Sequence, residues 1–169
     1  HDQLTSEAIG WIRANKEDPF FLYLPYCIPH AELTVPEDSL APYLKLGWKE
    51  KPKIVGTGNT GGGGYGSQYK KGYCGQSHPL ATYAGMISRM DRSIGKILDL
   101  LDELKLSENT LVIFSSDNGP SPEGGQSLKF FNSAGPLSGA KRSWREGGIR
   151  VPMIARWKGK IKPGRTSDH

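Results

Sequence analysis

The sequence predicts an α/β fold in which a mixed, mostly parallel sheet is flanked by helices. Two apolar runs of strand length, residues 20–24 and 111–114, stand on either side of the strongest helical pattern in the chain, residues 81–105. A strand, a long helix and a second strand in this order are typical of a βαβ unit, whose two strands lie parallel in one sheet. A further strand is predicted at residues 149–157. The chain should therefore form one α/β layer, which we expect to be incomplete.

The N-terminal segment predicts a helix followed by a buried strand. Apolar residues recur at helical spacing near the start of the chain: Leu4, Ala8, Ile9 and Ile12. This spacing, with Thr5 as the candidate N-cap, predicts a short helix over residues 5–15. The run FFLYL at residues 20–24 is continuously apolar and lies between prolines, as in a strand that is buried on both faces. Closely spaced prolines then predict a loop over residues 25–36.

The middle of the chain predicts a long loop and then a long helix. Glycines dominate the loop or insertion at residues 45–80 and leave little apolar surface to offset the entropy of ordering it. The helix predicted at residues 81–105 is amphipathic, because apolar side chains recur in it every three or four residues. They are Tyr83, Met86, Ile87, Met90, Ile94, Ile97, Leu98, Leu101 and Leu104. A second glycine-rich loop precedes the strand predicted at residues 149–157.

The composition excludes several functional classes. The chain has 169 residues, 36% of them hydrophobic, and contains no apolar run near the roughly 18 residues that a membrane-spanning helix needs. Its formal net charge is +5, but the basic residues are scattered, whereas nucleic-acid binding favours a continuous basic stripe. The chain has two cysteines, which cannot form a disulfide scaffold, and no basic signal-peptide segment precedes the first apolar run. We therefore expect no membrane span and no nucleic-acid partner.

Polar side chains at the ends of two predicted strands form the candidate site. His30 follows the strand at residues 20–24, and Asp117 and Asn118 follow the strand at residues 111–114. In open parallel sheets, ligands bind beyond the carboxyl ends of the strands. A carboxylate beside a carboxamide suits Ca²⁺ or Mg²⁺, although S-D-N-G is also ordinary turn chemistry.

Residue type alone allows two interpretations of the role of each of two basic side chains. His30, flanked by proline and alanine, serves either as a catalytic group or as part of the loop packing. Lys141 lies in a glycine-rich segment, where it is either a surface lysine or a point charge for a tetrahedral oxyanion.

Three segments, taken in order, carry a resemblance to a known family. They are PFFLYLPYCIPHAEL, YAGMISRMDRSIGKILDLLDELKLSENTLVIFSSDNGP and FFNSAGPLSGAKRSWREGGIRVPMIARWKGKI. The last contains the pattern G-x-K-x-x-x-x-E-G-G-x-R-V-P. With these segments the chain resembles the sulfatase family, in particular arylsulfatases and N-acetylgalactosamine-6-sulfatase-like enzymes of the alkaline-phosphatase-like fold. The resemblance implies that residues 1–169 are the central part of a sulfatase catalytic domain.

The resemblance also implies roles for the candidate residues. Asp117 and Asn118 match the pair that ligates the divalent cation of the family, usually Ca²⁺, with Mg²⁺ as the alternative. His30 matches the histidine near the leaving-group oxygen of the sulfate ester, and Lys141 matches the lysine that binds a sulfate oxygen. Residues 146–150 match an architectural segment that holds the lysine loop against the following strand.

The reaction implied is the hydrolysis of sulfate monoesters of small molecules or, more specifically, of glycans. A sulfate ester needs positive charge on its nonbridging oxygens and a proton donor at its departing oxygen, which agrees with these roles. Family habit implies a periplasmic, secreted or lysosomal location. Neither the sugar nor the oligomeric state follows from the sequence.

The nucleophile of the family is expected outside this segment. Sulfatases use a formylglycine made from Cys or Ser in the pattern C/S-x-P-x-R. The segment Cys27-Ile28-Pro29-His30-Ala31 has the cysteine and the proline, but Ala31 stands where arginine is required, so we reject it. The chain 1–169 alone is therefore expected to be a fragment without sulfatase turnover. A further departure is Ser121, where relatives often carry a histidine.

Two other functions remain open. A phosphatase or phosphonate hydrolase on the same scaffold would also use a lysine and a divalent cation, because tetrahedral oxyanions resemble one another. A non-catalytic module would bind an acidic polysaccharide through the glycine-rich residues 56–75 and the basic surface.

Overall fold

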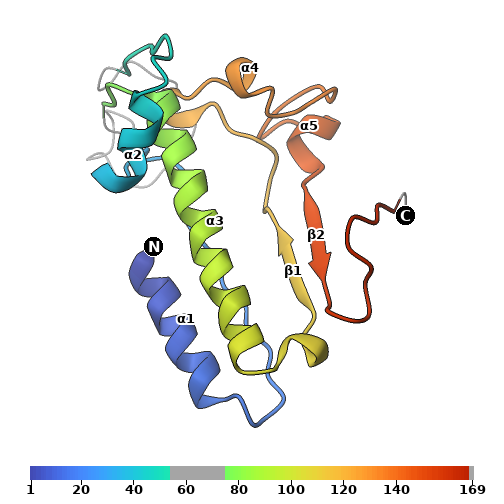
Figure 1. Cartoon of the computed structure of the whole chain (residues 1–169). Coiled ribbons are helices and arrows are strands. Elements are labelled where there is room, and N and C mark those ends of the chain that lie inside the picture. The colour runs from blue at the N-terminus through green and yellow to red at the C-terminus, as the bar shows by residue number, and fades with distance from the viewer. Residues whose placement is uncertain (54–74, 168–169) are drawn as a thin grey trace, which may run out of the picture.

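A long helix, α3 (Pro79–Glu103), runs through the middle of the protein, whose residues 1–53 and 75–167 are described by a computed structural model (Figure 1). The helix predicted at residues 81–105 is therefore confirmed, with each end two residues earlier. Its buried residues lie mainly in its first two turns and its last turn. The two buried stretches pack against different parts of the chain.

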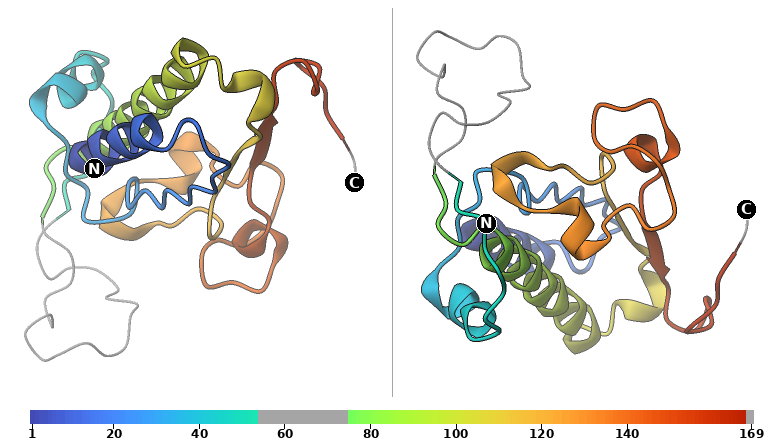
Figure 2. Two further views of the ribbon diagram at one scale, coloured as in Figure 1. Left: turned by 90° about the horizontal axis from the view of Figure 1, so that it is seen from below. Right: turned by 90° about the horizontal axis from the view of Figure 1, so that it is seen from above.

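The helix α1 (Asp2–Ala14) packs beside α3 and confirms the predicted N-terminal helix. Figure 2 shows both helices side by side, with the strands to one side of them. Ile12 is 1% exposed and lies in a core with Leu100 and Leu101. Burial of a side chain of this size stabilises the fold by about 1.5–3 kcal/mol. The core thus joins α1 to the end of α3.

The predicted N-cap of α1 is wrong. His1 occupies the N-cap position, and Thr5 is a buried residue within the helix. The Thr5 hydroxyl lies 3.0 Å from the Tyr26 hydroxyl, so it serves a tertiary contact in place of a cap. A threonine near a helix start predicts a cap only when its side chain faces the helix end.

The prediction of a doubly buried strand at residues 20–24 is also wrong. The segment belongs to no sheet within the described residues, and Phe21 and Tyr23 are 88% and 75% exposed. Phe20 and Leu22 pack on the core, whereas the alternate residues Phe21 and Tyr23 face away from it. A continuously apolar run cannot show that only one of its two faces is covered.

The sheet that forms is a two-stranded antiparallel pair, β1 (Val112–Ser115) and β2 (Met153–Arg156). Val112 lies opposite Arg156, and Ser115 lies opposite Met153. The predicted parallel pairing of residues 20–24 with 111–114 is therefore not formed among the described residues. Residues 20–30 nevertheless run in the same direction as β1: Leu22 and Val112 belong to one core, and His30 contacts Lys141, whose backbone is bonded to the turn after β1.

The carboxyl end of β1 points toward the short helices α4 and α5, whereas α2 packs against α3 and η2 directly precedes β1 (Figure 1). The elements η3, α4 and α5 fall in the predicted second glycine-rich loop, because helices of three or four residues leave no periodic pattern, and α2 and η2 were not predicted. The predicted strand at residues 149–157 begins too early, since Ile149 still belongs to a helix. The elements are α2 (Glu37–Leu44), η2 (Ser107–Asn109), η3 (Glu123–Gly125), α4 (Leu128–Phe131) and α5 (Glu146–Ile149).

Most of the predicted glycine-rich loop at residues 45–80, namely residues 54–74, lies outside the described residues. At its edges Lys53 and Gln76 form an antiparallel bridge.

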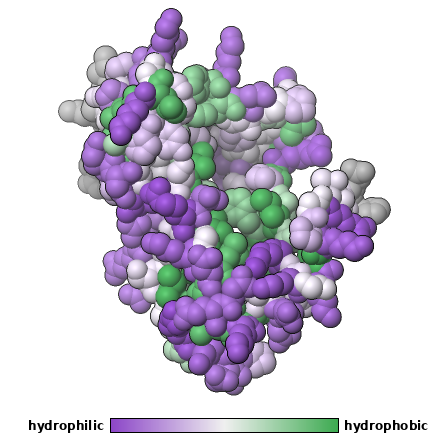
Figure 3. Space-filling view, in the orientation of Figure 1, coloured by the Kyte–Doolittle hydropathy of each residue, from purple (hydrophilic) through white to green (hydrophobic). Residues whose placement is uncertain are grey.

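Exposed apolar atoms are visible between the helical layer and the strands (Figure 3), and β2 contributes the exposed Met153 and Ile154. Among the described residues, we find no helix with the length and apolarity that crossing a membrane requires.

Candidate functional site

The S-D-N-G turn after β1 is packed tightly against α5. The Gly119 N–H donates to the Gly148 carbonyl at 3.0 Å. A Cβ atom at Gly119 would collide with the Gly147 carbonyl oxygen, and one at Gly148 with the Ser143 carbonyl oxygen. Only glycine permits these close backbone approaches. This packing is consistent with the architectural role expected for residues 146–150.

The loop that carries Lys141 is attached to the same turn. The Lys141 N–H donates to the Pro120 carbonyl at 2.9 Å, and the Ser143 N–H closes a turn onto the Ala140 carbonyl at 2.8 Å. Arg142 has a φ of 71°, a left-handed conformation that non-glycine residues rarely adopt. The Lys141 side chain is 17% exposed, so the loop directs its ammonium group inward.

Lys141 and His30 are brought into direct contact, although 111 positions separate them in the chain. The Lys141 ammonium donates to His30 Nε2 at 3.0 Å. The other ring nitrogen, Nδ1, donates to the carbonyl of Ala31. The tautomer with its proton on Nδ1 satisfies both of these contacts. In this arrangement Nε2 is the nitrogen that faces the lysine.

Asp117 and Asn118 lie directly after β1, in the turn to which Lys141 is attached. Asp117 is exposed, and Asn118 is half-buried. The Asn118 side-chain amide donates to the Gly119 carbonyl at 2.7 Å, which leaves its side-chain oxygen as an acceptor or ligand. A carboxylate and an amide oxygen fit part of the six to eight oxygen ligands that Ca²⁺ takes. Within residues 1–53 and 75–167, no group of three or more His, Cys, Asp or Glu side chains is arranged to hold a metal ion.

The sequence analysis missed Glu123, which lies against Lys141. Glu123 Oε2 is 3.5 Å from Lys141 Nζ and 4.0 Å from His30 Nε2, and Oε1 is 2.8 Å from Arg142 Nη2. The Ser121 hydroxyl donates to Oε2 at 3.0 Å. Ser121 departs from the family pattern, and in the structure it helps to hold this carboxylate.

The carboxyl group of Glu123 ionises more readily than usual. Burial by itself would raise its pKa, but the hydrogen bonds from Ser121 and Arg142 and the charges of Lys141 and Arg142 lower it by more. The sequence signal was weak, because Glu123 stands in P-E-G-G, which reads as a surface turn. Its one local clue is the serine two residues earlier, which also accepts the Glu123 N–H at 3.2 Å.

A pocket of about 190 Å³ lies elsewhere, between α1, α2 and α3. Its lining includes Arg89, which binds Asp2 and Asp38, and Arg92, which donates to the Ser39 hydroxyl. Its lining includes none of the candidate site residues. We therefore treat it as part of the contact between the three helices.

The comparisons with known proteins establish the family. The Sulfatase family model matches residues 1–169, so the chain belongs to the sulfatase family. The resemblance stated from the sequence is confirmed.

The relatives are longer than this chain. It is 32% identical to an N-acetylgalactosamine-6-O-sulfatase of Bacteroides thetaiotaomicron over 97% of the chain and 26% of that protein. It is 33% identical to the human steryl-sulfatase over 98% of the chain and 23% of that protein. The chain thus spans about a quarter of the length of these relatives.

A solved structure supports the fold. The crystal structure of Ps i-CgsB in complex with k-i-k-neocarrahexaose matches 94% of the chain and 28% of that protein, at 30% identity and a TM-score of 0.66. The α/β fold class inferred from the sequence therefore holds at the level of the family, while the described residues form only a two-stranded part of a sheet.

Proposed function

We propose that the whole protein hydrolyses sulfate monoesters and that Lys141 and His30 act on the ester. The observation that carries this proposal is the 3.0 Å contact between Lys141 Nζ and His30 Nε2, at the carboxyl end of β1. Membership of the sulfatase family supports the reaction class. The roles of the individual residues are those that the resemblance to this family implies, and the contact between them supports the assignment.

Lys141 supplies positive charge to a nonbridging sulfate oxygen, and His30 supplies the proton for the departing oxygen. These two roles are linked, because the ammonium occupies His30 Nε2 before the substrate arrives. When the ammonium turns to the sulfate, Nε2 becomes available to face the leaving group. Since Nδ1 already holds one proton, His30 must take up a second proton on Nε2 before it donates.

Asp117 and Asn118 would hold a divalent cation, Ca²⁺ or alternatively Mg²⁺, through their side-chain oxygens. When bound, the cation would supply additional positive charge to the sulfate group. A formylglycine made from a Cys or Ser outside residues 1–169 would supply the nucleophile. For this reason the isolated chain should show no turnover.

A sulfated glycan is the substrate class that we favour, in an exported compartment such as the periplasm, the cell exterior or the lysosome. Two relatives support it by their names: an N-acetylgalactosamine-6-O-sulfatase and a protein crystallised with a neocarrahexaose. Trp144, three residues after Lys141, is 94% exposed and offers a flat aromatic face on the same loop. Such a face can stack against the apolar side of a sugar ring.

The experiment is a turnover assay of the whole protein with 4-nitrophenyl sulfate and 4-nitrophenyl phosphate. We expect the sulfate ester to be the better substrate and Lys141→Ala to lower kcat/KM by about 10²–10³-fold or more. The exposed Lys129, changed to Ala, is the matched control and should leave the rate unchanged. Preferential hydrolysis of the phosphate ester would support a phosphatase. Retention on heparin without any turnover would favour a polysaccharide-binding module.

A further inference from the structure

The buried carboxylate of Glu123 is a second feature of this site. Its side chain is only 7% exposed, and burial of a carboxylate is unfavourable unless cations and hydrogen-bond donors compensate it. Lys141, Arg142 and Ser121 provide this compensation. These contacts give the carboxylate of Glu123 a defined position.

Glu123 fixes where the Lys141 ammonium lies. Lysine carries its charge on a flexible four-carbon stem, so the charge takes the position that its partners impose. Lys141 Nζ is 3.0 Å from His30 Nε2 and 3.5 Å from Glu123 Oε2, and these two acceptor atoms are 4.0 Å apart. The ammonium therefore sits between an imidazole and a carboxylate.

Glu123 also sets the net charge of the cluster. The carboxylate cancels one of the two positive charges of Lys141 and Arg142, so these three side chains together carry one net positive charge. A sulfate monoester carries one negative charge, whereas a phosphate monoester carries about 1.5–2 at neutral pH. Glu123 therefore lowers the positive charge that faces the ester by one, which disfavours the more highly charged phosphate monoester relative to the sulfate monoester.

We propose that Glu123 is a positioning residue that holds the Lys141 ammonium beside His30 and favours monoanionic sulfate esters over dianionic phosphate esters. This inference rests on the proposed function, because it concerns the same site.

The test compares binding of 4-nitrophenyl sulfate and 4-nitrophenyl phosphate to the whole protein by calorimetry, together with kcat and KM on the sulfate ester. Glu123→Gln should raise the affinity for the phosphate ester relative to the sulfate ester by about tenfold, because it adds one net positive charge near the ligand. It should also lower kcat more than it changes KM, because the ammonium loses the carboxylate that keeps it within the site as it turns from His30 to the sulfate. Glu108→Gln, an exposed carboxylate in η2, is the charge-matched control and should change neither.

A second variant should change the ratio of the two affinities in the opposite direction. Arg142→Gln removes one positive charge and should shift the affinity ratio toward the sulfate ester, and it decides the question if Glu123→Gln does not fold. The proposal would be overturned if, in the variants that fold, the ratio of the affinities for the two esters stayed within about twofold of the ratio in the unchanged protein. Failure of the proposed function would show itself separately, as absence of sulfate-ester turnover in the unchanged protein, and the binding ratio would still be measurable.

Discussion

The charged groups at the carboxyl end of β1 and those between the helices are arranged in opposite ways. At the site, a buried carboxylate, Glu123, is surrounded by cations. Between α1, α2 and α3 a guanidinium, Arg89, is central, and the largely exposed Asp2 and Asp38 bind it from two helices. In the helical cluster the hydrogen bond from Arg89 is the main cause that lowers the pKa of Asp2.

The difference separates a site from a structural contact. The acids bound to Arg89 face solvent, where water and salt screen their charges, so the cluster mainly connects the helices. At the site, burial keeps Glu123 and Lys141 in a defined geometry, and the loop that carries Lys141 is exposed at Trp144. Substitutions in the two regions should therefore affect different properties.

The largest effect is expected at the strand end of the site. Asp117→Ala should lower kcat/KM by about 10²–10³-fold or more without unfolding the whole protein, because it removes an exposed carboxylate from the proposed cation site. Chelation should abolish activity, and added Ca²⁺ should restore it in the unchanged protein far better than in the variant. Asp99→Ala, an exposed carboxylate on α3, is the control. Full activity of Asp117→Ala would remove this residue from the site.

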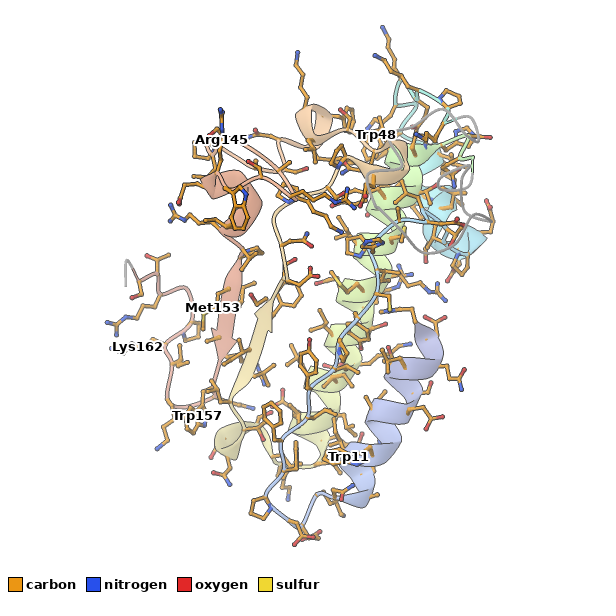
Figure 4. The ribbon with its side chains drawn as sticks, turned by 180° about the vertical axis from the view of Figure 1, so that it is seen from behind. Trp11, Trp48, Arg145, Met153, Trp157 and Lys162 are labelled. Atoms are coloured by element: carbon orange, nitrogen blue, oxygen red, sulfur yellow. The ribbon has the colours of Figure 1, made fainter. Side chains whose placement is uncertain are left out.

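A smaller effect is expected at Trp144. Trp144→Ala should raise KM for a sulfated oligosaccharide by about tenfold and leave kcat/KM for 4-nitrophenyl sulfate nearly unchanged, because only the longer substrate reaches the indole. Trp157→Ala is the control: its indole N–H donates to the Glu108 carbonyl at 2.9 Å. Figure 4 shows Trp157 at the opposite end of the molecule from Arg145, the residue after Trp144. Equal losses on both substrates would contradict a glycan-binding role.

In the helical cluster we expect a change in stability alone. Arg89→Met should lower Tm by about 2–4 °C, because it removes the hydrogen bonds to Asp2, Asp38 and Ser39. The kcat of the whole protein should not change. Arg13→Met, which removes a more exposed pair with Glu103, should lower Tm less. A fall in kcat at temperatures where Arg89→Met is folded would contradict the separation of the two regions.

The smallest effect is a pH dependence of stability at Glu123. Because its pKa is lower in the folded protein, its stabilisation is fully present above the ordinary carboxyl pKa and is lost as the pH falls through the lowered value. The Tm difference between the unchanged protein and Glu123→Gln should therefore shrink on acidification, in melts followed from pH 7 to pH 3. A difference that grows with acid would show the opposite sign of the shift.

Several local features could be predicted because short-range physics determines them. The amphipathic spacing in α3 gives its position to within two residues, and the strand at 111–114 follows from a short apolar run bounded by turn residues. The prediction of a doubly buried strand at 20–24 was wrong because two adjacent residues of the same type, Phe20 and Phe21, face opposite ways. Which face is covered depends on neighbours that the run itself does not contain.

The candidate site was predicted in part for the same reason. The structure brings His30 and Lys141 into contact, whereas their chemical roles and the cation site remain predictions. Glu123 could not be placed, because its direction depends on a turn folding back onto a loop eighteen residues further along the chain.

The sequence alone determined the family, the long helix and the residue types available at the strand ends, because these depend on spacing and on neighbours close in the chain. Only the tertiary structure decided that β1 pairs with β2 in antiparallel fashion and that a buried acid stands beside Lys141 and His30. Pairing and burial are set by contacts between distant segments, and the free energy of a buried charge depends on every group around it.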